Sequence, residues 1–310
     1  MSAKTSIEWT GATYNPVTGC TEVSEGCDRC YAKTFAERWR GTPGHYFEHG
    51  FDIQLRPDKL MLPMTWSKPR RIFVNSMSDL FHADIPDEYI AKVFAVMAAT
   101  PQHTYQILSK RHGRMRSLLN SDGFHRAVLA ETARQQDEKH PMPAWHPGTR
   151  RLKNWPLPNV HLGVSVEDQQ WADIRIPALM RTPAAVRFLS CEPLLGPIDL
   201  IGDVHAGHEY DDVNGHPHPL VCLTCSTDDE EVEYFRREHT IPGLDWVIAG
   251  AESGAGARPM DLGWVRSLRD QCVDAGVAFF FKQDAVKGKK VPTPELDGRT
   301  WTQMPTAVAA

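Results

Sequence analysis

The chain has few cysteines and no long apolar run. It contains seven cysteines in 310 residues, and no apolar run approaches the roughly 18 residues needed to cross a bilayer. Its first residues lack an apolar core followed by a small-residue cleavage site, so we expect a cytoplasmic protein that does not bind membranes. A net charge of −5 and a hydrophobic content of 41% exclude a disordered or collagen-like chain.

Three familiar catalytic or nucleotide-binding motifs are also missing. A serine hydrolase elbow, Gly-x-Ser-x-Gly around Ser253, would need glycine where the chain has Ala251. Gly250, Gly254 and Gly256 do not form Gly-x-Gly-x-x-Gly, and there is no Walker-type phosphate loop. The sequence therefore does not support a serine hydrolase, a dinucleotide-binding enzyme or a P-loop nucleotidase.

What the chain does contain is an alternation of short apolar, β-branched runs with helical patterns. Nearly continuous hydrophobicity is typical of strands that are buried on both faces. The alternation predicts an α/β fold, a partial (β/α) barrel of about six parallel strands. The predicted strands are residues 70–76, 104–110, 160–166, 186–192, 245–252 and 277–283.

The same pattern divides the chain into a core, an insertion and a tail. We expect residues 1–201 and 244–290 to form one barrel-like core, with the cysteine loop near its start. Residues 202–243 are rich in His, Asp, Glu, Gly and Pro and interrupt the β/α alternation, so they are predicted to be an insertion. Residues 291–310 are predicted to be an irregular C-terminal tail.

Three helices are indicated by their periodicity and end signals. Pro86 is predicted at the first position of one helix, and Asp261 is predicted to cap a second that stops at Gly276. A third follows the clustered cysteines, where apolar residues recur at Ala32, Phe35, Ala36 and Trp39. The cysteine loop is thus expected to lead directly into a helix.

Polar side chains follow most of the predicted strands. In parallel β/α folds the carboxyl ends of the strands form one edge, where ligands bind. We therefore expect these residues to contribute to a polar site, with solvent-facing strand ends as the alternative. They are Asn75, Asp79, Glu167, Glu192, Glu252, Ser253 and Lys282.

Three of the seven cysteines, Cys20, Cys27 and Cys30, lie within "NPVTGCTEVSEGCDRCYAK" with the spacing C-x6-C-x2-C. In a reducing compartment, clustered cysteines more often bind metal than form disulfides. A structural zinc ion would need a fourth ligand, for which His45, His49 and His82 are candidates. A [4Fe–4S] cluster with three thiolates would instead leave one iron open to a small molecule. Both interpretations remain open on the residues alone.

This loop resembles that of radical S-adenosylmethionine enzymes, particularly the branch related to DNA-repair photoproduct lyases. Its first gap is six residues, where the commonest pattern has three. The resemblance implies a radical-SAM-like barrel, a [4Fe–4S] cluster on Cys20, Cys27 and Cys30, and S-adenosyl-L-methionine as cofactor. It also implies a 5'-deoxyadenosyl radical, an electron donor protein, and cofactor contacts from Tyr31 and the polar residues at the strand ends.

A second resemblance extends over nearly the whole chain. The stretches "EWTGATYNPVTGC", "FVNSMSDLFH", "GVSVED", "SCEPLLGPID", "DWVIAGAESGAGARPM", "FFFKQ" and "DGRTW" are similar to a phage and prophage protein family of unassigned function, sometimes called the three-Cys-motif family. This resemblance implies the same fold and cluster but no substrate.

Two further regions have a functional and a plain interpretation. The insertion carries ligand-type residues that predict a second metal site for Zn²⁺, with an acidic loop of incidental histidines as the alternative: His205, His208, His216, His218, Cys222 and Cys225. Trp145 and Trp155 flank Arg150, Arg151 and Lys153, a combination suited to nucleic acid or to a surface connection.

The sequence therefore yields two hypotheses. The first is a radical S-adenosylmethionine-like iron–sulfur enzyme of unknown substrate, with nucleic acid modification or repair as its suggested role. The second is a non-catalytic phage accessory protein in which the three cysteines hold a structural zinc ion.

Overall fold

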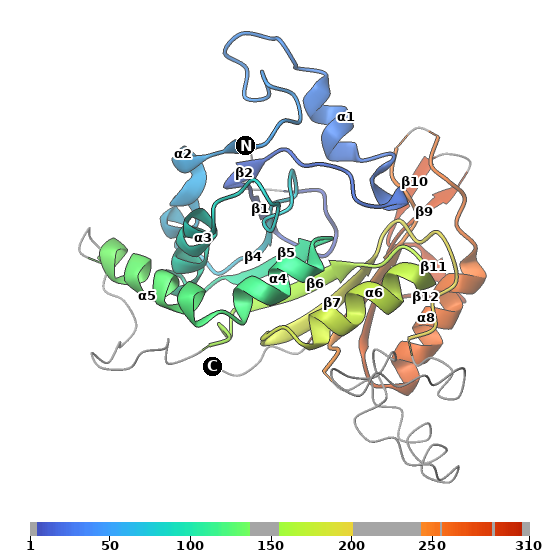
Figure 1. Ribbon diagram of the computed structural model, residues 1–310. Coiled ribbons are helices and arrows are strands. Elements are labelled where there is room, and N and C mark those ends of the chain that lie inside the picture. The colour runs from blue at the N-terminus through green and yellow to red at the C-terminus, as the bar shows by residue number, and fades with distance from the viewer. Residues whose placement is uncertain (1–4, 137–154, 201–242, 255, 287–288, 306–310) are drawn as a thin grey trace. The chain divides into compact units, whose positions relative to one another are not determined.

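The computed structural model describes residues 5–136, 155–200, 243–254, 256–286 and 289–305 (Figure 1). It divides into two compact units, which are described separately. The first comprises Met1–Gly163, Thr182–Ala185 and Val308–Ala310, and the second comprises Val164–Arg181 and Val186–Ala307.

The elements are short strands alternating with helices, as the sequence predicts. In chain order they are β1 (Ala12–Tyr14), β2 (Val17–Thr18), a 3-10 turn (Glu25–Cys27), α1 (Tyr31–Glu37), β3 (Gln54–Leu55), α2 (Pro57–Leu60), a 3-10 turn (Leu62–Thr65), β4 (Arg71–Val74), α3 (Asp87–Ala99), β5 (Thr104–Ser109), α4 (His112–Leu119), α5 (Asp122–Gln136), β6 (Val160–Ser165), α6 (Gln169–Met180), β7 (Val186–Cys191), β8 (Trp246–Gly250), α8 (Leu262–Asp274), β9 (Ala278–Val286), β10 (Lys289–Pro292), β11 (Glu295–Leu296) and β12 (Arg299–Thr300).

The first unit contains a sheet whose strands follow the order β1-β4-β5-β6. β1 and β5 both pair with β4 in parallel, with Ile72 opposite Ala12 and Tyr105. The predicted strands 70–76, 104–110 and 160–166 are therefore confirmed as β4, β5 and β6. β1 has only three residues and is a further parallel neighbour of β4. So short a strand has too little periodicity to be indicated strongly by the sequence.

One face of this sheet is covered by helices. The Tyr105 hydroxyl lies 2.6 Å from the hydroxyl of Thr100, the residue that follows α3, and the Tyr14 hydroxyl donates to the carbonyl of Leu60 in α2. Phe94 of α3 packs edge-on against Phe124 of α5, so α3 and α5 lie side by side (Figure 1). The residues that alternate with Tyr105 along β5 therefore point to the opposite face.

The start of α3 differs slightly from the prediction. Pro86 precedes the helix in an extended conformation, with ψ of 141°, and Asp87 is the first helical residue. Asp87 and Glu88 occupy the first turn, where the helix dipole favours negative charge.

The second unit contains strands in the order β7-β8-β9-β10. β7, β8 and β9 are parallel, and they confirm the predicted strands 186–192, 245–252 and 277–283. The Asp261 carboxylate accepts the Gly263 N–H at 2.7 Å and caps α8, and Gly276 follows that helix with a φ of 65°. The predicted limits of this helix are thus confirmed.

The described part of the tail is more ordered than predicted. β10 pairs antiparallel with β9, β11 pairs with β12, and the Phe281 N–H donates to the Trp301 carbonyl at 2.8 Å. The interpretation of the tail as irregular is therefore wrong for this part. Strands of two to four residues have too little periodicity to be recognised without their partners.

Taken unit by unit, the fold is mixed α/β with mostly parallel strands. Among the described helices, none is both long enough and apolar enough to cross a membrane.

Candidate functional site

The three clustered cysteines lie on one loop of the first unit, between β2 and α1. Cys27 ends the 3-10 turn and Cys30 immediately precedes the first residue of α1. All three thiols are partly buried. Cys20 and Cys30 pack against the same apolar cluster, which consists of Ala32, Ala36, Phe47, Phe51 and Met77. The loop thus brings at least two of its thiols onto one hydrophobic base.

Gly19 fixes the entry of the chain into this loop. Its φ is 91°, and a Cβ atom there would lie 2.2 Å from the Asp52 carbonyl oxygen. The Gly19 N–H donates to the Met77 carbonyl at 2.9 Å, and the Cys20 N–H donates to the Phe51 carbonyl at 3.2 Å. Only glycine allows this backbone approach, which explains the Gly-Cys pair of the motif.

Burial keeps two of the thiols protonated in the absence of metal. Burial raises the pKa of Cys20 to about 11, the charge of Asp79 raises it further, and Arg111 opposes the rise. Burial also raises the pKa of Cys30, against the N–H groups of Lys33 and Ala32 that donate to its sulfur. The charge of Cys27 contributes to both shifts, so the three sulfurs interact. A metal cation would stabilise the thiolates and displace these protons.

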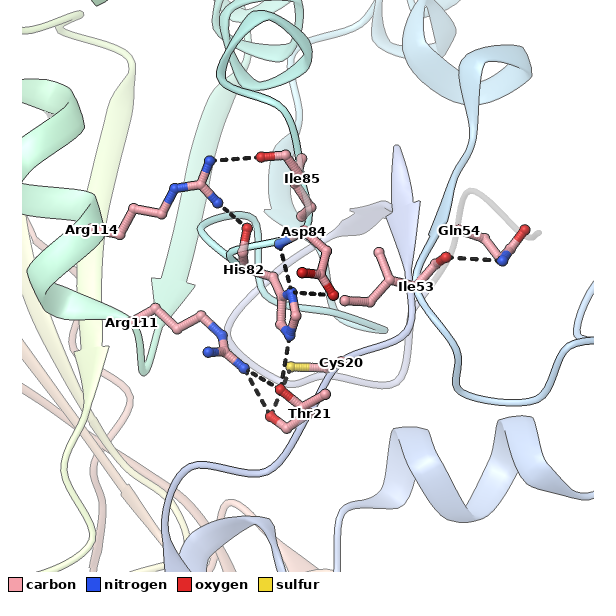
Figure 2. A network of polar contacts seen from close by, with 9 residues as sticks. All are labelled: Cys20, Thr21, Ile53, Gln54, His82, Asp84, Ile85, Arg111 and Arg114. Atoms are coloured by element: carbon pink, nitrogen blue, oxygen red, sulfur yellow. Dashed lines mark hydrogen bonds and ion pairs between the residues drawn. The ribbon is translucent and has the colours of Figure 1, made fainter.

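Polar contacts tether the backbone that follows Cys20 (Figure 2). Arg111 donates through Nη2 to the Thr21 carbonyl at 3.1 Å and to its hydroxyl at 2.7 Å. The Nε2 atom of His82 lies 2.8 Å from the same hydroxyl. Because Arg111 immediately precedes α4, these bonds connect the cysteine loop to the start of that helix.

Two of the three histidines considered as a fourth zinc ligand, His45 and His82, have other partners. The Nδ1 atom of His82 accepts the Asp84 N–H at 3.2 Å, so its neutral ring carries the proton on Nε2 and donates it to Thr21. His45 accepts the Phe47 N–H through Nδ1 and stacks on Trp39. Within the described ranges, no group of three or more His, Cys, Asp or Glu side chains is placed to hold a metal ion.

Asp79 is buried behind the loop and accepts hydrogen bonds on both oxygens. Oδ1 accepts from the Phe81 N–H at 3.0 Å, and Oδ2 accepts from the Lys110 N–H at 2.9 Å. The Ser109 hydroxyl lies 2.9 and 3.1 Å from the two oxygens. This carboxylate therefore joins the end of β5 to the loop after β4. Its predicted cofactor contact stays a prediction.

Tyr31 and Asn75, two more predicted cofactor-binding residues, lie in the same unit. Tyr31 is 51% exposed, and its hydroxyl donates to the Ser76 carbonyl at 2.6 Å. Asn75 follows β4 with a φ of 59° and is 3% exposed. Both polar atoms of its side chain lack a hydrogen-bond partner in the described part of the chain.

In the second unit, Glu192, the residue after β7, pairs with Lys282, which lies in the middle of β9 and not at its end as predicted. Lys282 Nζ lies 2.9 Å from Glu192 Oε1, and the Ser190 hydroxyl donates to Oε2 at 3.2 Å. A Cβ atom on Gly250 would lie 2.8 Å from Glu192 Oε1. The absence of a side chain at Gly250 therefore leaves space for the Glu192 carboxylate to lie over β8, between β7 and β9.

The other predicted residues of this unit are engaged nearby. Gln283 donates through Nε2 to the Ser253 hydroxyl at 2.7 Å. Glu252 accepts from the guanidinium of Arg258 and from its N–H, the latter at 2.9 Å. The carboxylates of Glu192 and Glu252 are thus each paired with a cation of the second unit.

Glu167 forms a fully buried ion pair with Arg175 of α6. Glu167 Oε2 accepts from Arg175 Nη1 at 2.8 Å, and the same nitrogen donates to the Ser165 carbonyl at 2.9 Å. The guanidinium also stacks on the ring of Trp171, 3.9 Å from its centroid. This geometry connects the end of β6 to α6. The cofactor contact expected of Glu167 stays a prediction.

Several predicted residues lie outside the described part of the chain. They are the whole insertion set, His205, His208, His216, His218, Cys222 and Cys225, and the aromatic and basic residues Trp145, Arg150, Arg151 and Lys153. Trp155 is described. Its ring packs 4.3 Å from that of His125 and 5.9 Å from that of Phe94, as a core residue would.

Two buried polar residues of the first unit were not singled out from the sequence. Gln106 lies on β5 and His161 on β6, and each has a polar atom without a hydrogen-bond partner among the residues described. The available signal was a polar residue inside an otherwise apolar strand, in "TYQILSK" and "VHLGVSV".

Comparison with protein families gives one match, which extends over residues 4–305. The matching family is described as "Protein of unknown function (DUF5131)". It agrees with the expected membership of a family of unassigned function. No curated protein and no solved structure matches the chain.

Proposed function

The chain belongs to the DUF5131 family, and we propose that it is an iron–sulfur enzyme of the radical S-adenosylmethionine type. Cys20, Cys27 and Cys30 would be the thiolate ligands of a [4Fe–4S] cluster. The observation that carries the proposal is the loop itself, which holds three partly buried thiols, two of them on one apolar base, with Cys27 acting electrostatically on the other two.

The surroundings of the thiols fit such a group. When bound, a [4Fe–4S] cluster with one open iron supplies an electron and a site for the amino and carboxylate groups of S-adenosyl-L-methionine. The apolar cluster limits the access of water to Cys20 and Cys30, and the charges of Arg111 and Lys110 favour the thiolate forms of these two residues. The Thr21 tether would hold Cys20 in place.

The remaining parts of the proposal rest on the resemblance and on residue chemistry. The mostly parallel strands are consistent with a radical-SAM-like partial barrel. Tyr31 and Asn75, in the same unit as the cysteines, would contact the cofactor. The cofactor contacts expected of Glu192, Glu252, Ser253 and Lys282 stay predictions from the resemblance. An electron donor protein would reduce the cluster, and nucleic acid is the substrate class that the resemblance suggests.

The test is metal analysis of protein expressed with excess iron and purified without oxygen. We expect about four irons and four sulfides per chain, and loss of both in Cys20→Ala, Cys27→Ala and Cys30→Ala. Cys272→Ala is the matched control, because Cys272 is buried in α8 and the variant should keep its iron. Stoichiometric zinc without sulfide would instead support the accessory protein with a structural metal.

A second measurement separates an enzyme from a protein that only carries a cluster. Reduced, iron-loaded protein should convert S-adenosyl-L-methionine to 5'-deoxyadenosine, and Cys27→Ala should not. A loaded and reducible cluster that yields no 5'-deoxyadenosine would refute the enzymatic part of the proposal.

A further inference from the structure

Gln106 and His161 lie next to each other on the face of the first unit's sheet that α3 does not cover. Asn159 donates through Nδ2 to the His103 carbonyl, so β5 and β6 start side by side and run in parallel. The Tyr105 N–H donates to the Asn159 carbonyl at 2.8 Å, which in a parallel ladder sets Tyr105 opposite Val160. Gln106 is therefore opposite His161, and both alternate with the helix-facing Tyr105 and Val160.

Both side chains are buried with unused hydrogen-bonding capacity. Gln106 is 1% exposed and His161 is 8% exposed. Gln106 Oε1 and His161 Nδ1 have no hydrogen-bond partner within the described ranges, and the same holds for both amide atoms of Asn75, which follows the neighbouring β4. An unsatisfied buried polar group costs about 1–3 kcal/mol, so native proteins retain few of them without a reason.

Two other amides of the same unit, half-buried Asn159 and buried Asn15, have hydrogen-bond partners. Asn159 donates to the carbonyls of Met97 and His103, and Asn15 bonds to the Ser76 hydroxyl and the Met77 N–H. These amides hold the backbone together. Among the described residues, Gln106 Oε1 and both amide atoms of Asn75 make no such bond.

The pair is uncharged at neutral pH. Burial alone lowers the pKa of His161 to about 4, and the glutamine side chain does not ionise. An anion or cation would lose its hydration here without gaining an opposite charge from these side chains. A carbonyl acceptor and a neutral imidazole together suit a ligand that both donates and accepts hydrogen bonds.

We propose that Gln106 and His161, with Asn75 at the end of β4, form a binding site for an uncharged amide group, an N–H beside a C=O. Such a group occurs in carboxamides and in the ring amides of nucleobases. The site shares Asn75 with the cofactor contacts of the proposed function, but Gln106 and His161 have no part in that proposal, so the inference goes beyond it and does not depend on it.

The experiment measures binding and stability on the full-length chain. Nicotinamide and uridine carry the two kinds of amide, and nicotinate is an anion of nearly the same shape as nicotinamide. We expect nicotinamide or uridine, but not nicotinate, to bind in calorimetry and to shift the His161 ring nitrogen resonances in NMR spectra. Binding of uridine alone would assign the site to a ring amide.

Two variants distinguish a ligand site from a structural amide. Gln106→Met keeps the length of the side chain and removes the unpaired carbonyl, so binding should weaken about tenfold or more while the unfolding temperature stays the same or rises. Asn159→Leu is the matched control and should unfold at a lower temperature, because it removes satisfied hydrogen bonds.

Three results would overturn the inference: no response of His161 to either amide, equal binding of nicotinate, or destabilisation of Gln106→Met to the extent of Asn159→Leu. The readout needs no metal. If protein expressed with excess iron and purified without oxygen contains no iron but still binds the amide, the proposed function is refuted and this inference stands.

Discussion

Each cysteine of the loop is positioned by a different local feature of the backbone. Cys20 follows a glycine that lies against the Asp52 carbonyl, Cys27 ends a 3-10 turn, and Cys30 precedes the first turn of α1. The positions of the sulfurs are therefore set by the backbone of the loop rather than by contacts of the thiols with one another.

The first prediction concerns Gly19→Ala. A Cβ atom 2.2 Å from a carbonyl oxygen must displace the loop, and a φ of 91° strains any residue other than glycine. We expect a loss of about 1–3 kcal/mol in the free energy of unfolding and a clear loss of bound iron.

The matched control for this variant is Gly41→Ala. Gly41 has a φ of 77°, but a Cβ atom there would have no neighbour within 4 Å. The Gly41→Ala variant should lose some free energy of unfolding because of backbone strain, and it should retain its bound iron. Equal iron loss in the two variants would contradict the assignment of Gly19 as the residue that positions Cys20.

At the same scale, the sequence predicted which residues are polar but not what they contact. Asp79 was identified as a strand-end carboxylate. Its partners in the loop after β4 and at the end of β5 could not be predicted, because they depend on tertiary contacts. Gln106 and His161 were missed because a single polar residue in an apolar strand is also compatible with an ordinary satisfied side chain.

At the scale of elements, Asp79 connects the loop after β4 with the end of β5. In Asp79→Asn one oxygen becomes an NH₂ group, which would face an N–H or hydroxyl donor. We expect a loss of about 1–3 kcal/mol in the free energy of unfolding, measured with denaturant.

The same variant makes a prediction for pH dependence. The charge of Asp79 raises the pKa of Cys20, so its removal should lower that pKa from about 11 and move the alkylation of metal-free Cys20 to lower pH. Asp79 is not among the main causes of the raised pKa of Cys30, so Cys30 serves as the internal control in the mass spectrum. An unchanged Cys20 profile would refute this coupling.

The elements themselves were predictable where burial is continuous. β4 to β9 are central strands whose residues are mostly apolar, so their hydrophobic runs mark them without a partner in view. β10, β11 and β12 were not predicted, because their existence depends on antiparallel pairing with residues that precede or follow them by only a few positions.

At the scale of the whole molecule, the alternation of strands and helices predicted the mixed α/β class. The division into two units was not predicted, since no composition shift marks it and β6 contains the boundary between Gly163 and Val164. The residues predicted for the cluster and the cofactor follow that division: the cysteines, Tyr31, Asn75 and Asp79 belong to the first unit, and Glu167, Glu192, Glu252, Ser253 and Lys282 belong to the second.

The stability of the second unit should depend strongly on its buried ion pair. Arg175→Met would leave the fully buried Glu167 without its guanidinium partner, which typically costs about 3–5 kcal/mol. Arg266→Met removes an exposed ion pair with Asp297 and should cost at most about 1 kcal/mol. Denaturant unfolding measures both, and similar losses would contradict the importance assigned to Arg175.

The raised pKa of Cys20 also has a consequence for the life of the newly made protein. Oxidants attack the thiolate and not the thiol, so a thiol with a pKa of about 11 reacts slowly with peroxide at neutral pH. In the proposed enzyme the Cys20 thiol would therefore stay reduced until the cluster is assembled. Burial, which disfavours the charged sulfur, would thereby protect this ligand against oxidative damage.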